Sequence, residues 1–201
     1  KQLLGLDYVI LKETYAALQP TIDPGKGKSI HQVLVNFGGA DLHDKTGRIT
    51  HLLLENFPDW KLLVVIGGMY GHADRLESRL NEVTEDRYRL YVNTPEMPAL
   101  MAQANLAITG GGLTAWELGA LYTPNVVIPS SERELRTAER LSALSLVYCF
   151  GSDEQLTDDQ IVDALRSIAL SPSDRLRRAG RMAQAINVNG AEKVARAFFE
   201  Y

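Results

Sequence analysis

The chain alternates short, continuous apolar runs with longer stretches in which apolar residues recur at every third or fourth position. Runs of the first kind are typical of strands buried on both faces of a parallel sheet, and stretches of the second kind predict amphipathic helices. Strands are predicted at Ile30–Phe37, Lys61–Ile66, Tyr88–Asn93, Asn105–Thr109, Val126–Pro129 and Leu146–Phe150. Helices are predicted at Lys45–Asn56, His72–Glu82, Pro95–Ala104, Leu113–Leu121, Glu132–Leu144, Asp158–Ala169, Ser173–Ala185 and Ala191–Phe199. This alternation predicts an α/β fold with a Rossmann-like parallel sheet and helices on both faces.

Four segments carry more specific expectations. Leu3–Leu11 is apolar and is predicted to be either a short strand or a packed arm, whereas Gln19–Ser29, with two prolines and two glycines, is predicted to be a loop. The helix at His72–Glu82 is polar, so we expect it to be exposed. The helix at Leu113–Leu121 is apolar nearly all round, so we expect it to be buried.

Three of the predicted strands end in glycines, at Gly38-Gly39, at Gly67-Gly68 and at Gly110-Gly111-Gly112. The last cluster leads directly into a helix. Glycines let a backbone approach a phosphate closely, and the free N–H groups and the dipole at a helix N-terminus favour negative charge. In open α/β sheets, ligands bind at the carboxyl ends of the strands. The stretch Ala104–Pro129 is therefore predicted to hold an anion site.

Glu117 lies one turn into the helix that follows the triple glycine. A carboxylate there could accept hydrogen bonds from the two hydroxyls of a ribose whose phosphate lies on the glycines. It could equally be an acidic residue near the helix start that only complements the helix dipole. The residue pattern leaves both interpretations open.

Other motifs are excluded by spacing. Gly27-Lys28-Ser29 is not a P-loop, because Ile22 stands where the earlier glycine is required and the motif precedes a strand. Gly67–Gly71 lacks the spacing of a dinucleotide-binding loop. The four histidines and Cys149 show no metal-ligand spacing, although Asp41 and His43 follow the first glycine pair; we expect neither a metal nor a cofactor.

Composition limits the class of protein. The chain has 201 residues and a formal net charge of −4, which argues against nucleic acid as a partner. The single cysteine fits a reducing compartment, no apolar run approaches the roughly 20 residues of a membrane span, and we expect a cytoplasmic protein. Because the chain starts at Lys1 and with an apolar element, we expect it to be a piece of a longer protein.

The order of four segments resembles a known family. FGGAD (Phe37–Asp41), VIGG (Val65–Gly68), the stretch Tyr91–Pro129 and NVNGAEKVARAF (Asn187–Phe198) are similar to the C-terminal half of GT-B-fold nucleotide-sugar enzymes. The opening LGLDYVIL (Leu4–Leu11) looks like the UDP-sugar hydrolase of pseudaminic acid biosynthesis and its spore-coat polysaccharide (SpsG-like) relatives. The peptidoglycan N-acetylglucosaminyltransferase is a more distant relative with the same domain plan.

This resemblance implies roles for particular residues. Gly38 and Gly39 would face the diphosphate, and Glu117 would hold the UDP ribose. The remaining implied contacts are Gly111, Gly112 and Thr114 on a phosphate and the backbone around Asn93–Met97, with Asn93 and Thr94 as its site residues, on the uracil.

One departure from the family falls on two neighbouring residues. Relatives tend to carry Asn-Gln after the Val126–Pro129 strand, where this chain has Arg133 and Glu134. Arg133 could pair with the diphosphate, whereas Glu134 would repel it. Either the sugar differs from the expected one, or the activity is altered or lost.

The resemblance also implies a division of the chain and three hypotheses. Residues 1–29 would lead in from a missing N-terminal domain, and residues 30–201 would form the nucleotide-sugar-binding domain with C-terminal helices. The chain would be the donor-binding half of a UDP-amino-sugar hydrolase, with UDP or a UDP-sugar and the N-terminal domain as partners. No catalytic residue is expected here, because the general base in these relatives is a histidine of the N-terminal domain. The alternatives are the same half of a GT-B glycosyltransferase, or a non-enzymatic nucleotide-sugar-binding module.

Overall fold

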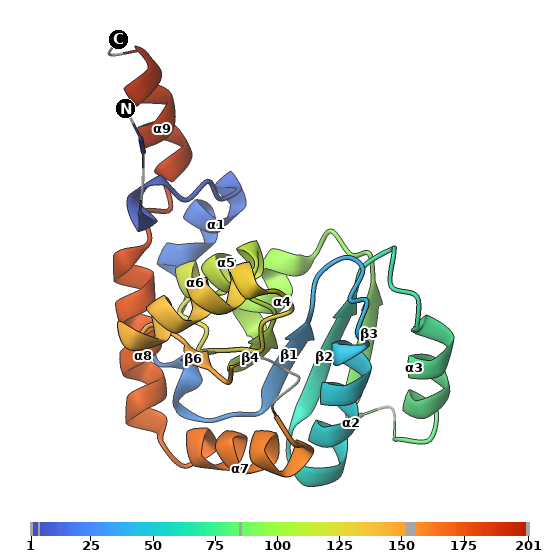
Figure 1. Ribbon diagram of the computed structural model, residues 1–201. Helices are drawn as coiled ribbons and strands as arrows, with labels where there is room; N and C mark the ends of the chain where they lie inside the picture. The colour runs from blue at the N-terminus through green and yellow to red at the C-terminus, as the bar shows by residue number, and fades with distance from the viewer. Residues whose placement is uncertain (1, 4, 85, 152–155, 200–201) are drawn as a thin grey trace.

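The computed structural model describes residues 2–3, 5–84, 86–151 and 156–199. Within this part of the chain a six-stranded, entirely parallel sheet forms in the order β3-β2-β1-β4-β5-β6 (Figure 1). The strands are β1 (Gln32–Asn36), β2 (Lys61–Ile66), β3 (Tyr88–Val92), β4 (Leu106–Thr109), β5 (Asn125–Val127) and β6 (Tyr148–Cys149). All six predicted strands are present, with small differences at their ends.

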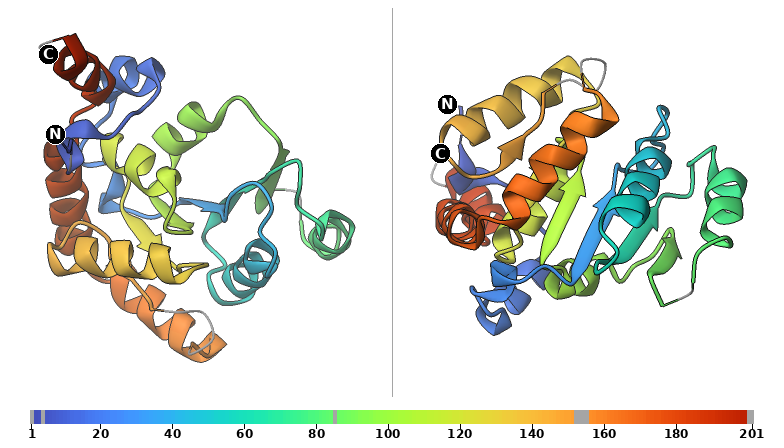
Figure 2. Two further views of the ribbon diagram at one scale, coloured as in Figure 1. Left: turned by 45° about the horizontal axis from the view of Figure 1, so that its top comes forward. Right: turned by 90° about the horizontal axis from the view of Figure 1, so that it is seen from below.

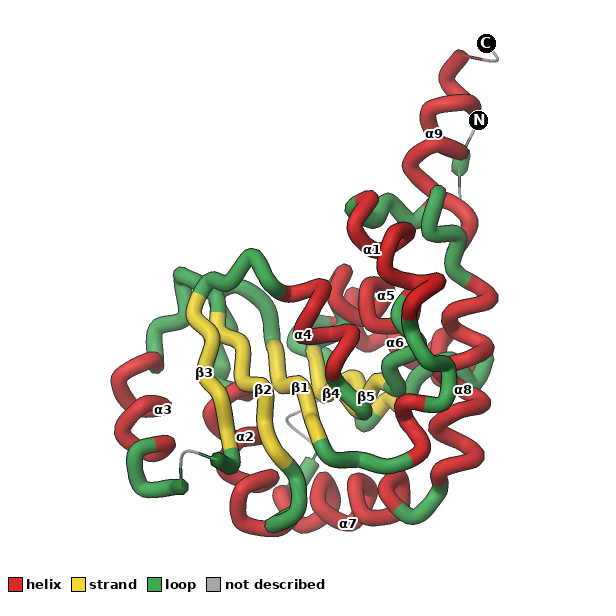
Figure 3. The backbone as a smooth tube through the Cα atoms, turned by 180° about the vertical axis from the view of Figure 1, so that it is seen from behind, coloured by secondary structure: helices red, strands yellow, loops and turns green. Residues whose placement is uncertain are grey.

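Helices cover both faces of the sheet, as predicted. They are α1 (Glu13–Leu18), α2 (Lys45–Asn56), α3 (Ala73–Leu80), α4 (Met97–Gln103), α5 (Leu113–Ala120), α6 (Glu132–Ala143), α7 (Asp158–Ala169), α8 (Pro172–Ala185) and α9 (Gly190–Phe199). One face packs against α2, α3 and α7, and the other against α1, α4, α5, α6 and α8. Figure 1 is seen from the side of α2 and α7, and Figure 3, from behind, from the side of α1 and α4.

Successive strand residues supply the two faces in turn. In β1, Val33 and Val35 join the core under α2 and α7, whereas Leu34 joins the core under α4 and α5. The same alternation holds in β4, where Ile108 points to the first core and Ala107 to the second. Burial on both faces explains why the strands have continuous apolar runs instead of an alternating pattern.

The chain reverses its direction across the sheet between β1 and β4. From β1 the strands β2 and β3 are added on one side, and β4, β5 and β6 then follow on the other side of β1. The loops that leave β1 and β4 therefore diverge at the carboxyl edge of the sheet. Such a reversal is where open α/β sheets form a ligand crevice.

The N-terminal segment is a packed arm, and the alternative of a strand is wrong. Of its described residues, Leu6–Tyr8 form one turn of 3₁₀ helix, and Leu11 is buried; residue 4 lies outside the described part. The arm runs along the start of α9, where the Asn187 amide donates to the Leu6 carbonyl (3.3 Å) and Lys193 pairs with Asp7 (3.0 Å). The sequence pattern did not predict the short helix α1 that follows.

Three further expectations need correction. The helix α3, expected to be exposed, buries Leu76 and Leu80 against the core, although Figure 2 shows it at the β3 edge apart from the other helices. The helix α5 is buried as expected at Ala115 and from Leu118 to Ala120, and the correction concerns its first residue alone, since Leu113 is 53% exposed. The helix predicted from Pro95 begins two residues later, at Met97, because the Thr94 hydroxyl accepts from the Glu96 amide in a turn.

A buried arginine connects α8 to the rest of the fold. The Arg175 side chain is 1% exposed, and its guanidinium donates to the carbonyls of Gly27 (3.0 Å) and Lys28 (2.8 Å). It also donates to the carbonyls of Ile168 and Ala169 at the end of α7. A buried guanidinium is tolerated only when its N–H groups are bonded, and these carbonyls meet that requirement. Arg175 thus fixes the loop before β1 and the end of α7 to the same helix.

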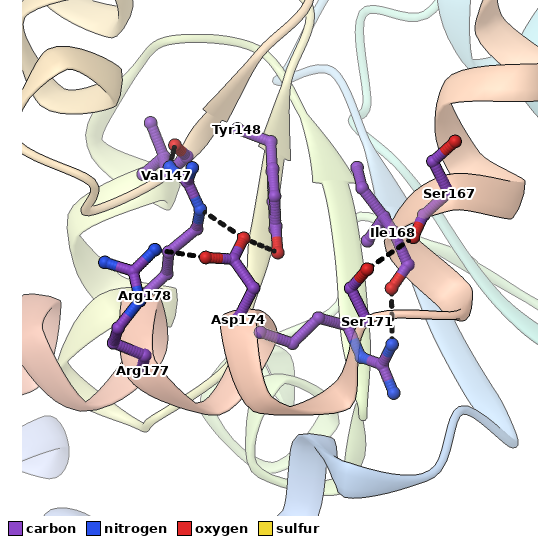
Figure 4. Close-up of polar contacts among 9 residues, drawn as sticks. Val147, Tyr148, Ser167, Ile168, Ser171, Asp174, Arg177 and Arg178 are labelled. Carbon is purple, nitrogen blue, oxygen red and sulfur yellow. Dashed lines mark hydrogen bonds and ion pairs between the residues drawn. The ribbon is translucent and has the colours of Figure 1, made fainter.

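A carboxylate on α8 joins this helix to the edge strand β6. Asp174 accepts from the Tyr148 hydroxyl (2.7 Å), from Arg178 Nε (2.8 Å) and from Arg177, as Figure 4 shows. Arg178 lies over the Tyr148 ring and donates to the Val147 carbonyl (2.8 Å). Burial alone would raise the pKa of Asp174, but the hydrogen bonds from Arg178, Tyr148 and Arg177 outweigh it and lower the pKa to about 2.

We predict that Asp174→Asn lowers the free energy of unfolding by about 1–2 kcal/mol at pH 7, because charge-assisted hydrogen bonds are lost at a partly exposed site. The pKa of Asp174 is lowered on folding, so its stabilisation is complete above pH 4 and is lost as the pH falls towards 2. The difference between wild type and variant, measured by urea unfolding at several pH values, should shrink over that interval. Asp163→Asn, which removes an exposed pair with Arg166, is the control and should change stability by less than about 0.5 kcal/mol. A pH-independent difference would contradict the prediction.

Candidate functional site

The first two glycine loops pack against each other at the carboxyl edge of the sheet. A Cβ atom at Gly67 would lie 2.4 Å from the Cα atom and the carbonyl oxygen of Gly39. The Met69 amide donates to that same carbonyl (3.2 Å), and Gly38 adopts a left-handed backbone with φ of 87°. These glycines therefore have a packing role, whatever ligand they face.

The start of α2, directly after the first glycine loop, is filled by carboxylates from its own chain. Asp41 accepts from the amides of Lys45 (3.1 Å) and Thr46 (2.7 Å), and Asp44 accepts from the Gly47 amide (3.2 Å). Two negative charges already complement this helix N-terminus. It is therefore unsuited to a bound phosphate.

The third glycine turn leads into α5, which begins without a side-chain cap because its N-cap residue is Gly112. Within the described residues, the amides of Gly112, Leu113 and Thr114 have no hydrogen-bond acceptor. A helix start of this kind offers free N–H groups and the positive end of the dipole. It is suited to bind an anion.

Glu134 occupies the neighbouring donor of the same turn. Its Oε2 atom accepts from the Gly111 amide (3.2 Å) and from the Ser130 amide (2.7 Å). The Gly111 backbone also lies in close contact with the Glu134 side chain, since a Cβ atom added at Gly111 would stand 2.7 Å from the Glu134 Cβ atom. The sequence predicted that the Glu134 carboxylate would repel a diphosphate. This carboxylate lies directly on the glycine turn.

A cleft of about 530 Å³ opens in front of this turn, between α5 and α6. Its lining consists of Gly111, Gly112, Leu113, Trp116, Ser131, Arg133, Glu134 and Thr137. The Arg133 side chain is exposed and makes no hydrogen bond or ion pair with the other described residues. An anion in the cleft would meet free backbone donors and a guanidinium on one side and a carboxylate on the other.

Glu117 lies outside this lining and faces α1. Burial raises the pKa of its carboxyl, and interactions with the Tyr15 hydroxyl and the Lys12 ammonium partly oppose that rise. Tyr15 is almost fully buried, and its pKa is raised by burial and by the Glu117 carboxylate. The sequence analysis did not predict an influence of Tyr15 on Glu117, because it assigned neither a structure nor a function to the segment around Tyr15.

Asn93 and Thr94 follow β3, which is separated from β4 by two strands, β2 and β1. Asn93 has a left-handed backbone (φ 46°), and its amide donates to the Ile66 carbonyl (2.9 Å). Of the residues predicted to bind ligand, the cleft brings together Gly111, Gly112, Arg133 and Glu134. It does not include Gly38, Gly39, Asn93, Thr94, Thr114 or Glu117. Among residues given no ligand contact by the sequence, Trp116 and Ser131 line it.

Two negative observations apply to the described residues. No three His, Cys, Asp or Glu side chains gather there in a way that could hold a metal ion. No helix in the described ranges has both the length and the apolar character needed to cross a membrane.

The open parallel sheet and the uncapped glycine turn beside its reversal point define a Rossmann-like domain of the ligand-binding type. The sequence profile of the glycosyltransferase family 28 C-terminal domain matches residues 41–196. The chain belongs to that family.

Two curated proteins are similar to the chain in sequence. The chain is 31% identical over 130 residues to the uncharacterised protein MJ1062 of Methanocaldococcus jannaschii, a match that covers 64% of this chain and 27% of that protein. It is 25% identical over 175 residues to the spore coat polysaccharide biosynthesis protein SpsG of Bacillus subtilis, covering 86% of this chain and 50% of SpsG. The chain thus spans half or less of the length of these two relatives.

The fold is that of the C-terminal Rossmann-like domain of GT-B glycosyltransferases, as the sequence predicted. The crystal structure of Acinetobacter baumannii MurG matches this chain with a TM-score of 0.71 at 13% identity. The match covers 100% of this chain and 56% of the MurG chain. At this identity the likeness concerns the fold alone.

We predict that Gly67→Ala destabilises the protein by about 1–3 kcal/mol, because the new methyl group would collide with the Gly39 backbone, which cannot move aside as a side chain can. Gly71→Ala is the control, since a Cβ atom at Gly71 meets nothing within 4 Å. The measurement is the melting temperature of each variant. Equal melting temperatures would show that the two loops are not packed as described.

Proposed function

We propose that this chain is the nucleotide-sugar-binding half of an enzyme with two domains, and that a nucleoside diphosphate binds at the start of α5. The observation that carries the proposal is the start of α5, where the amides of Gly112, Leu113 and Thr114 are free and where Gly112 and Leu113 line the cleft beside the reversal point of the sheet. Membership of the glycosyltransferase family 28 C-terminal domain family supports it.

Binding would rest on the backbone and on one side chain. Amide N–H groups and the helix dipole stabilise a diphosphate without a metal ion, and they also stabilise it as a leaving group. Arg133 at the rim of the cleft could approach the same phosphates. Gly38 and Gly39 would close the opposite side of the site, and Thr114 would add its hydroxyl.

The ribose and the base would bind away from the glycine turn. Glu117, one turn into α5, would accept hydrogen bonds from both ribose hydroxyls, and the Tyr15 hydroxyl and the Lys12 ammonium favour the charged form of its carboxyl. The backbone of Asn93 and Thr94 would contact uracil. We therefore propose UDP as the nucleotide.

As the particular reaction we propose hydrolysis of a UDP-amino-sugar in nonulosonic acid or surface polysaccharide biosynthesis. The relationship to SpsG and the similarity of the opening segment to UDP-sugar hydrolases support this choice. Water would attack the anomeric carbon, the bond to the diphosphate would break, and UDP would leave with the bonding electrons. Residues 30–201 would form the binding domain, and residues 1–29 would lead in from an N-terminal domain that supplies the general base.

The second candidate is a glycosyltransferase that uses the same half-site with an acceptor alcohol in place of water. The likeness of the fold to MurG favours it. The third candidate is a non-enzymatic binding module, which the position of Glu134 on the glycine turn favours. The difference between the first two lies in the other domain.

If Glu117 holds the ribose, Glu117→Gln should weaken UDP by roughly 10- to 100-fold, as expected for the loss of charge-assisted hydrogen bonds. Calorimetric titration with UDP and with 2′-deoxy-UDP measures the effect directly. Wild type should prefer UDP, and the variant should bind both nucleotides equally. The control is Glu77→Gln on the exposed face of α3. An unchanged preference for UDP would make Glu117 structural.

For the reaction itself, we predict that the 201-residue chain binds UDP but releases no sugar from UDP-N-acetylglucosamine. A longer protein that contains this chain should release free amino sugar and UDP in equal amounts, detected by chromatography. Sugar found only on an added acceptor would favour the transferase. Multiple turnovers by the isolated chain would contradict the placement of the general base.

A further inference from the structure

We propose that Glu134 is an internal competitor of the ligand phosphate, so that its carboxylate must leave the Gly111 amide before a diphosphate can bind fully at the glycine turn. This inference rests on the proposed function, since it concerns the same site. It assigns to Glu134 control over the affinity and the charge selectivity of the site.

The contacts of Glu134 are those of a bound anion. One carboxylate oxygen accepts from two backbone amides, Gly111 at 3.2 Å and Ser130 at 2.7 Å, which belong to the loops after β4 and β5. A phosphate oxygen bound to a glycine turn makes contacts of the same type. The carboxylate thus holds the position that an oxygen of the ligand would take.

The position of Glu134 on α6 differs from that of an ordinary cap. Ser131 caps α6 by accepting from the Glu134 amide (3.3 Å), so Glu134 is the third residue of the helix. A glutamate there commonly turns back to the amide of the capping residue, as Gln160 does at the start of α7 with Thr157. The Glu134 carboxylate instead accepts from the amide of Ser130, the residue before the cap, and from the Gly111 amide in the loop after β4. The start of α6 is capped by Ser131, whereas the donor of the glycine turn is taken by Glu134.

The surroundings of Glu134 leave room for a ligand on one side only. Gly111 lies against its Cβ atom, so the side chain cannot move further into the turn. The other side is the cleft, which is lined by Gly112 and Leu113, with their free amides, and by the exposed Arg133 side chain. A diphosphate that enters the cleft therefore meets favourable donors first and the Glu134 carboxylate next to them. Two anions so close repel each other strongly, so binding requires that the carboxylate withdraw or be neutralised.

The test compares Glu134→Gln with Glu132→Gln. The first change keeps the size of the side chain and one amide oxygen that can still accept from the Gly111 or Ser130 amide, but it removes the charge. The second removes the same charge from an exposed residue on the first turn of α6, where it pairs only with Arg136 among the described residues. Both variants have the same net charge, so a difference between them reflects position. The ligands are UDP, inorganic pyrophosphate and uridine, followed by calorimetry and by the fluorescence of Trp116, which lines the cleft.

We expect Glu134→Gln to bind UDP and pyrophosphate at least about tenfold more tightly than wild type, and Glu132→Gln to stay within about twofold of it. Uridine, which carries no phosphate, should bind all three proteins with the same affinity. Equal affinity of the two variants for UDP, or weaker binding by Glu134→Gln, would contradict the proposal that Glu134 competes with the ligand. The proposed function would not be affected by that result. If neither wild type nor Glu134→Gln binds UDP or pyrophosphate, the proposed function itself fails, and the competitor fails with it.

Discussion

Every helix begins with amide groups that need an acceptor, and the way each helix meets that need decides where this domain can take a ligand. At the start of α2 the acceptors are the carboxylates of Asp41 and Asp44, and at the start of α7 the need is met by Thr157 and Gln160. The N-cap residue of α5 is Gly112, which has no side chain that could accept from these amides. The donors there remain open to the cleft, and the sheet reversal places them at a crevice.

The sequence predicted the fold well because the signals were local. Strands buried on both faces, such as KLLVVI at Lys61–Ile66, need no alternation, and the following glycines end them clearly. The errors arose where neighbours distant in sequence decide the outcome. The polar helix α3 buries Leu76 and Leu80 in the core that α2 and the sheet form, and the arm at Leu6–Tyr8 packs on a helix that begins at Gly190.

The site was predicted in part for the same reason. The glycine turn and α5 are continuous in sequence, so Gly111 and Gly112 could be placed at one helix start. Arg133 and Glu134 were expected near the phosphates only through the family resemblance, and the hydrogen bond of Glu134 to Gly111 depends on how α6 lies against the loop after β4. The spacing of apolar residues along the chain carries no information about this hydrogen bond between two separate loops. The electrostatic influence of Tyr15 on Glu117 could not be predicted either, because the sequence pattern did not predict α1.

The contact of Arg178 with the Val147 carbonyl has a consequence for the behaviour of the protein at high concentration. An open parallel sheet ends in strands whose outer backbone groups invite a strand from another molecule. Here β6 has only two residues, and the guanidinium of Arg178 both occupies the carbonyl just before it and covers the Tyr148 ring. A strand from another molecule would find little free backbone at this edge and would meet the Arg178 side chain there. That edge is thereby protected against intermolecular sheet growth.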